Sequence, residues 1–135
     1  MPVSRSEPGS RPSHRPRVLV ADDDVLLRTA VTRVLSVSCD VVGYASDSAT
    51  LFTATKTLRP QVVLLDFTLA GGLSGPEICR RLKAMVSEVS VVAFTGSDDP
   101  ELEQLAYEAG ASAFVSKLKS PDSLLRTIQA VIDSD

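Results

Sequence analysis

Short runs in which every residue is apolar alternate along this chain with longer segments whose apolar side chains recur at helical spacing. A short, uninterrupted apolar run is typical of a strand covered on both faces, and apolar residues three or four positions apart are typical of a helix. The pattern predicts five strands, at residues 18–21, 41–44, 61–66, 89–94 and 113–115. It predicts five helices, at residues 25–36, 47–58, 76–86, 100–109 and 121–132.

This regular alternation predicts one α/β domain. Strands that alternate with helices form a parallel sheet, and right-handed crossovers place helices on both of its faces. The same crossovers bring the carboxyl ends of the strands to one edge, where such sheets bind their ligands. A chain of 135 residues suits a single domain of this kind and can bury an adequate core.

Residues 1–16 differ from the rest in composition. They are rich in Pro, Ser and Arg and nearly free of large apolar side chains. Burial therefore cannot offset the entropy lost on ordering them. We expect a flexible, solvated tail at residues 1–16 and a folded domain at residues 17–133. His14, the only histidine, falls in this tail and is a poor candidate for catalysis.

Composition also limits the location and the partners of the chain. The formal net charge of −3 does not favour nucleic acid as a partner. No run has the length of a membrane helix, and the start lacks the apolar core of a secretory signal. Cys39 and Cys79 are far apart and have no metal-like spacing. We expect a cytoplasmic protein with two partly buried, reduced cysteines, no direct nucleic-acid binding and no membrane contact.

Polar residues lie at or just after the ends of four of the predicted strands, so they should meet at the carboxyl edge of the sheet. They are Asp22, Asp23, Asp24, Asp66, Thr95 and Lys117. Clustered carboxylates repel one another without a cation, and Mg²⁺ prefers such oxygen ligands. A carboxylate can also be a nucleophile that forms an aspartyl-phosphate. Because an ammonium and a hydroxyl would neutralise and orient a phosphoryl group, the set predicts Mg²⁺-dependent phosphoryl transfer.

Each of these residues also has a simpler explanation. An aspartate before a helix can cap it, and we expect Asp24 to do so. Thr95 and Gly96 can form an ordinary turn, and Lys117 can be a solvated surface charge. The full set at the ends of ordered strands favours a functional site over these separate explanations.

Four segments resemble successive landmarks of a response-regulator receiver domain. They are RVLVADDDVLLR, QVVLLDFTLAGGLSGPEI, VVAFTG and AGASAFVSKLKSPDSLL. The resemblance covers about residues 17–133. It implies a doubly wound, flavodoxin-like sheet of five parallel strands in the order 2-1-3-4-5. It also implies a two-component signalling switch rather than an enzyme, which catalyses only its own phosphorylation and dephosphorylation.

The resemblance assigns a role to each matching acidic position. Asp66 matches the aspartate that accepts the phosphoryl group. Asp22 and Asp23 match the acidic pair that holds Mg²⁺ together with Asp66. Thr68 matches the position that lends its backbone carbonyl to the metal.

The remaining matches concern the switch. Thr95 matches the switch Ser/Thr, Phe114 the switch aromatic residue, and Lys117 the lysine that pairs with the phosphoryl group. In the family, phosphorylation draws the Thr inward and turns the aromatic ring, which changes the surface of the fourth helix, fifth strand and fifth helix. The implied partners are a histidine kinase or phosphotransfer protein and a downstream protein that reads this surface. A second copy of the chain is a further candidate.

Two segments depart from the family pattern. Leu118 follows Lys117 where the family usually has a proline, often in a cis peptide. A non-proline cis bond costs about 2.5–4 kcal/mol, so we expect a trans bond there. KLKSPDSLL resembles the subgroup whose output is a small helix-turn-helix domain. The loop LAGGLSG, after Asp66, lacks the usual Met-Pro and is one residue longer than the commonest form.

The same acidic, Thr and Lys residues also bear on the other functions that this fold can carry. A pseudo-receiver, which binds partners without phosphorylation, is the main alternative, although its usual mark is the loss of an acid, the Thr or the Lys. Metal affinity would discriminate between the two. A haloacid-dehalogenase-like enzyme would carry a D-x-D-x-T pattern after the first strand. This chain has ADDDV there, which argues against that class. Three aspartates after the first strand would repel the phosphate of a flavin.

Overall fold

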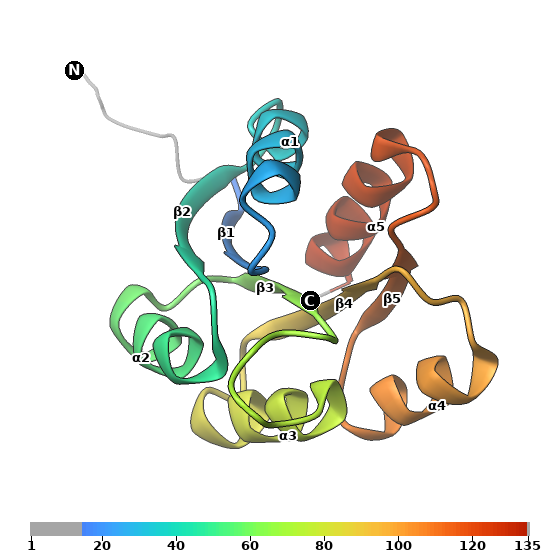
Figure 1. The fold of residues 1–135 in the computed structure, drawn as a ribbon. Helices are drawn as coiled ribbons and strands as arrows, with labels where there is room; N and C mark the ends of the chain where they lie inside the picture. The colour runs from blue at the N-terminus through green and yellow to red at the C-terminus, as the bar shows by residue number, and fades with distance from the viewer. Residues whose placement is uncertain (1–14, 135) are drawn as a thin grey trace.

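The computed structural model describes residues 15–134, which form a five-stranded parallel sheet between two layers of helices (Figure 1). The strand order β2-β1-β3-β4-β5 confirms the predicted doubly wound topology. The strands are β1 (Arg17–Ala21), β2 (Asp40–Ala45), β3 (Val62–Asp66), β4 (Ser90–Thr95) and β5 (Ala113–Ser116). The helices are α1 (Val25–Leu35), α2 (Ser48–Leu58), α3 (Gly75–Met85), α4 (Pro100–Glu108) and α5 (Pro121–Asp133). Every bound lies within one residue of the prediction.

Each helix begins at a side chain that accepts a backbone N–H of its own first turn, which satisfies one of the donors left free there. The capping residues are Asp24, Asp47, Ser74, Asp99 and Ser120. The helix α2 ends at Leu58 because the next residue, Arg59, has a φ of 50°, and Gly110 has a φ of 105° after α4. Within residues 15–134, none of the helices has the length and apolar character needed to cross a membrane.

The core consists of one apolar cluster on each face of the sheet. On one face, α2, α3 and α4 pack against the sheet through side chains such as Leu51, Ile78 and Leu82. On the other face, α1 and α5 contribute Leu35 and Ile128. Each such leucine or isoleucine contributes about 1.5–3 kcal/mol when fully buried. Burial on both faces explains why β1, β3 and β4 are apolar at almost every position.

The strand register brings the first polar residues after the strands together. Ala21 on β1 is in register with Leu65 on β3, so the next residues, Asp22 and Asp66, lie side by side. The ends of β4 and β5 are in register in the same way. The carboxyl edge of the sheet is therefore where the predicted site residues meet.

The described chain begins inside the predicted tail. The guanidinium of Arg15 donates to the carboxylate of Asp40 (2.8 Å) and to the carbonyl of Cys39 (2.9 Å). The carbonyl of Pro16 accepts the N–H of Asp40 (2.8 Å). The last two residues of the predicted tail are thus held against the domain by long-range contacts that composition does not reveal. The other part of that tail, residues 1–14, lies outside the described residues.

Both cysteines are free, and they are fully buried, although partial burial was expected. Burial raises the pKa of the Cys79 thiol to about 11, because the opposing charges of Lys83 and Arg80 are weaker effects. Burial also raises the pKa of Cys39. Both side chains therefore act as protonated, apolar groups at neutral pH.

Candidate functional site

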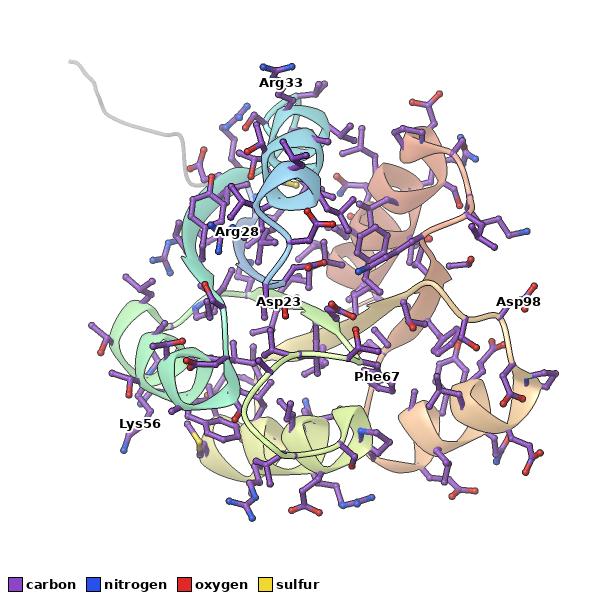
Figure 2. All side chains as sticks on the ribbon, viewed as in Figure 1. Asp23, Arg28, Arg33, Lys56, Phe67 and Asp98 are labelled. Atoms are coloured by element: carbon purple, nitrogen blue, oxygen red, sulfur yellow. The ribbon has the colours of Figure 1, made fainter. Side chains whose placement is uncertain are left out.

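Three carboxylates meet at the carboxyl ends of β1 and β3. One oxygen from each of Asp22, Asp23 and Asp66 lies within 4.8 Å of the others. Asp22 and Asp66 are each only 3% exposed, whereas Asp23 faces the solvent at this edge (Figure 2). Because like charges at this distance repel strongly when partly buried, the arrangement favours a bound cation. Hard carboxylate oxygens fit Mg²⁺ in particular.

One ammonium faces this cluster. The Nζ atom of Lys117 lies 2.9 Å from Oδ2 of Asp22 and 3.3 Å from Oδ2 of Asp66. It also lies 5.5 Å from the centroid of the Phe94 ring. Burial lowers the pKa of Lys117, but the hydrogen bond to Asp22 and the charge of Asp66 outweigh it, so the pKa rises above its usual 10.5. Lys117 is therefore charged at neutral pH, and its ammonium pairs with two of the three carboxylates.

The loop between β1 and α1 fixes the carboxylate of Asp22. Its Oδ1 atom accepts the N–H of Asp24 (2.9 Å), and its Oδ2 atom accepts from Lys117. Asp24 in turn caps α1 by accepting the N–H of Leu27 (3.1 Å), which confirms the predicted cap. Both oxygens of Asp22 are thus oriented before any ligand arrives.

The carboxylate of Asp66 is oriented by the residue two positions later. Its Oδ1 atom accepts both the N–H (3.0 Å) and the hydroxyl (2.9 Å) of Thr68. The prediction for Thr68 concerned its backbone carbonyl, and the side-chain contact was missed. A threonine two residues after an aspartate that ends a strand can close such a turn, and this spacing was the available signal. The Oδ2 atom of Asp66 is left facing Lys117.

Thr95 and Phe114 lie beside the carboxylates. The hydroxyl of Thr95, which is 2% exposed, accepts the N–H of Ser97 (3.3 Å). The ring of Phe114 packs edge-on against Phe67, with centroids 6.3 Å apart and an interplanar angle of 81°. Because Phe67 directly follows Asp66, this aromatic pair connects the acidic edge to β5. The contact was not predicted, since it joins residues far apart in the sequence, one just after β3 and one on β5.

A further residue at this edge, Arg28, was not singled out from the sequence. It is the fourth residue of α1, and its guanidinium donates to the hydroxyl of Ser46 (3.0 Å) at the end of β2. Helical side chains lean toward the amino end of their helix, so a long side chain at this position can reach the preceding loop. That geometric rule was the only signal in the sequence.

The peptide bond between Lys117 and Leu118 is trans, as expected, because residues 15–134 contain no cis peptide bond. The side chain of Leu118 is 78% exposed.

Comparison with known proteins identifies the family. The sequence model of the response regulator receiver domain matches residues 18–129. The chain belongs to the response regulator receiver domain family. One relative is the DNA-binding response regulator MtrA of Mycobacterium tuberculosis H37Rv, which is 35% identical over 116 residues. The match covers 86% of this chain and 50% of MtrA, so the chain spans about half the length of the curated relatives it matches.

Solved receiver structures agree with this assignment. The signal receiver domain of NarL from Mycobacterium tuberculosis has a TM-score of 0.84 and 27% identity, over 90% of this chain and 99% of that one. A LuxR-family response regulator from Aurantimonas sp. SI85-9A1 has a TM-score of 0.84 and 26% identity, over 89% and 86% of the two chains. The receiver domain described here is therefore a signalling switch of the two-component type, and its flavodoxin-like fold is confirmed.

The comparison corrects one expectation. Net charge alone suggested no direct nucleic-acid binding, but MtrA is a DNA-binding response regulator. The relatives therefore do not support that expectation, which rested on the net charge of a chain that spans about half the length of MtrA. The DNA-binding regulator MtrA and the LuxR-family regulator agree with the predicted resemblance to response-regulator receivers.

Proposed function

We propose that residues 17–133 form the receiver unit and accept a phosphoryl group on Asp66 in a Mg²⁺-dependent reaction. The observation that supports this most is the setting of Asp66. Its carboxylate is buried, oriented through Oδ1 by Thr68, and surrounded by two further carboxylates and an ammonium. A set of this kind is unfavourable for a purely structural aspartate.

In the transfer step, a carboxylate oxygen of Asp66 forms a bond to phosphorus. The bond between phosphorus and the histidine nitrogen of a kinase or phosphotransfer protein breaks, and its electron pair stays on the imidazole. The two hydrogen bonds from Thr68 hold the carboxylate in one rotation during the attack. The ammonium of Lys117 is already beside Asp66 and would pair with the phosphoryl oxygens.

The carboxylates of Asp22, Asp23 and Asp66, with the backbone carbonyl of Thr68, would hold Mg²⁺. When bound, Mg²⁺ neutralises the charge that accumulates on the phosphoryl oxygens. The carboxylate oxygens suit its preference for hard ligands, and the exposure of Asp23 leaves room for water ligands.

The switch would work through Thr95 and Phe114. The Thr95 hydroxyl would leave the N–H of Ser97 and donate to a phosphoryl oxygen, and Phe114 would repack against Phe67. This change alters the surface formed by α4, β5 and α5, which a downstream protein or a second copy of the chain would read.

Intact-mass measurement with acetyl phosphate and MgCl₂ tests this function. We expect the wild type to gain one phosphoryl group, and Asp66→Asn or the wild type in EDTA to gain none. Asp24→Asn is the matched control, because it removes a neighbouring acid while asparagine still caps a helix. If the folded wild type gains no mass from acetyl phosphate or from a phosphorylated histidine protein, the proposal fails and the pseudo-receiver alternative replaces it.

A further inference from the structure

The main-chain peptide of Asp22 is held from both sides. Its N–H donates to the carbonyl of Ala45 at the end of β2 (3.0 Å). Its carbonyl faces the guanidinium of Arg28 at 3.5 Å, the long limit of a hydrogen bond. The same guanidinium donates to Ser46 (3.0 Å) and stacks 5.3 Å from the centroid of the Tyr44 ring. Figure 2 shows Arg28 between α1 and β2.

These contacts hold the loop between β1 and α1 against the end of β2, a strand that carries none of the three site carboxylates. One guanidinium nitrogen, Nη1, makes both polar contacts while the planar group lies over the Tyr44 ring, which a lysine ammonium could not do in the same geometry. Tyr44 is itself held to α1, since its hydroxyl is hydrogen-bonded to that of Thr32 (3.1 Å). The result is a brace between α1, the end of β2 and the backbone of Asp22.

We propose that Arg28 is a positioning residue for Mg²⁺ binding, which holds the Asp22 backbone so that Asp22 and Asp23 share one ligand site with Asp66. The inference rests on the proposed function. Without the brace, mutual repulsion among the carboxylates would spread the loop away from Asp66. Residues that orient metal ligands without touching the metal commonly change its affinity by about 10–100-fold.

A simple charge effect predicts the opposite result. Arg28 carries a positive charge near an acidic site, so its Coulomb field alone weakens the binding of a cation. Removing that charge would then tighten Mg²⁺ binding. If Arg28 positions the ligands, removing it weakens Mg²⁺ binding instead, and the sign of the change separates the two explanations.

Isothermal titration of MgCl₂ into the full chain tests the proposal. We expect Arg28→Met to raise the Kd for Mg²⁺ about tenfold. Arg33→Met is the matched control, because Arg33 is an exposed arginine on the same helix, and we expect its Kd to stay within about twofold of the wild type. Arg28→Lys should give an intermediate Kd, since an ammonium cannot stack and donate to both acceptors in the same geometry.

A second variant guards against a general loss of structure. Tyr44 is 49% exposed, so Tyr44→Leu removes the stacking surface while the fold and the Arg28 charge remain. We expect weaker Mg²⁺ binding in Tyr44→Leu, and a double variant no weaker than Arg28→Met, because both changes act on one brace. Binding by folded Arg28→Met as tight as the wild type or tighter, or no weakening in Tyr44→Leu, overturns the positioning role and leaves the proposed function standing. If the wild type itself binds no Mg²⁺, the proposed function fails and the role of Arg28 fails with it.

Discussion

Polar groups are paired differently at the edge where the strands begin and at the edge where they end. At the amino edge, where the strands begin, the polar groups have direct partners: Gln61 donates its N–H to the carbonyl of Arg17 and accepts the N–H of Arg17 on its side chain. The N–H of Ser90 donates to the carbonyl of Gln61. The ion pair between Arg15 and Asp40 is about half exposed, with side-chain exposures of 43% and 52%.

At the carboxyl edge, three carboxylates lie together, and the two that are almost fully buried share the ammonium of Lys117. Such a set costs stability, because each buried charge loses its hydration and only part of the loss is regained. The same sheet therefore has one edge where the polar groups have partners and one edge where three carboxylates cluster around a single ammonium. This excess of negative charge at the carboxyl edge favours that edge as the functional site.

The largest expected contrast is in the rate of phosphorylation by acetyl phosphate. Asp23→Asn removes an exposed metal ligand at the carboxyl edge, and we expect the rate to fall at least about 100-fold, since metal stabilisation of the transition state is worth several kcal/mol. Asp40→Asn removes an exposed carboxylate at the amino edge and should leave the rate within about twofold. Equal rates in the two variants would remove the distinction between the edges.

The second contrast is in stabilisation by Mg²⁺. A ligand present at 100 times its Kd adds about 2.7 kcal/mol to the free energy of unfolding. We expect this gain, seen as a rise in Tm, in the wild type and in Asp40→Asn, and its loss in Asp23→Asn. A gain of the same size in Asp23→Asn would show that Mg²⁺ binds elsewhere.

The third contrast concerns the shared ammonium. Without Mg²⁺, Lys117→Met leaves Asp22 and Asp66 buried without a cation, and we expect a loss of about 2 kcal/mol in the free energy of unfolding at neutral pH. Urea denaturation of both proteins measures it. A variant as stable as the wild type would contradict the assigned ion pairs.

The pH dependence of this loss follows from the raised pKa of Lys117. A folded-state pKa above the usual 10.5 means that the ion pairs contribute fully below that pH and lose their contribution as pH rises through the folded pKa. The difference between wild type and Lys117→Met should therefore be constant from about pH 6 to 9 and shrink above about pH 10.5. A difference that grows with alkaline pH would have the wrong sign.

The smallest expected effect is at the amino edge. Arg15→Met breaks an exposed ion pair, and we expect less than about 1 kcal/mol of destabilisation, reduced further by salt. Affinity for Mg²⁺ should not change. Chemical denaturation at low and high salt, with the titration described for Arg28, measures both quantities. A larger loss would mean that the two edges depend on charge to a similar degree.

The elements and the acidic edge could be predicted because they depend on local patterns. The apolar runs before Asp22 and Asp66 define strands, and parallel strands must bring their carboxyl ends together. The capping role of Asp24 was also predictable, because it needs only a carboxylate at the start of a helix.

The side-chain network around the site could not be predicted in the same way. The stacking of Arg28 on Tyr44 joins residues far apart in sequence and depends on the register of β1 with β2. The packing of Phe67 against Phe114 similarly depends on how β3 and β5 are placed across β4. The contacts of Arg15 were missed because composition averages over a segment and does not register one long side chain.

The most direct test of the central claim is to locate the phosphoryl group. The wild type is phosphorylated with acetyl phosphate and MgCl₂, then treated with sodium borohydride, which reduces an aspartyl-phosphate to homoserine, and its peptides are sequenced by mass spectrometry. The account predicts homoserine at position 66 and aspartate at positions 22 and 23. Homoserine at position 22 or 23, or an unchanged aspartate at position 66 in phosphorylated protein, would contradict it.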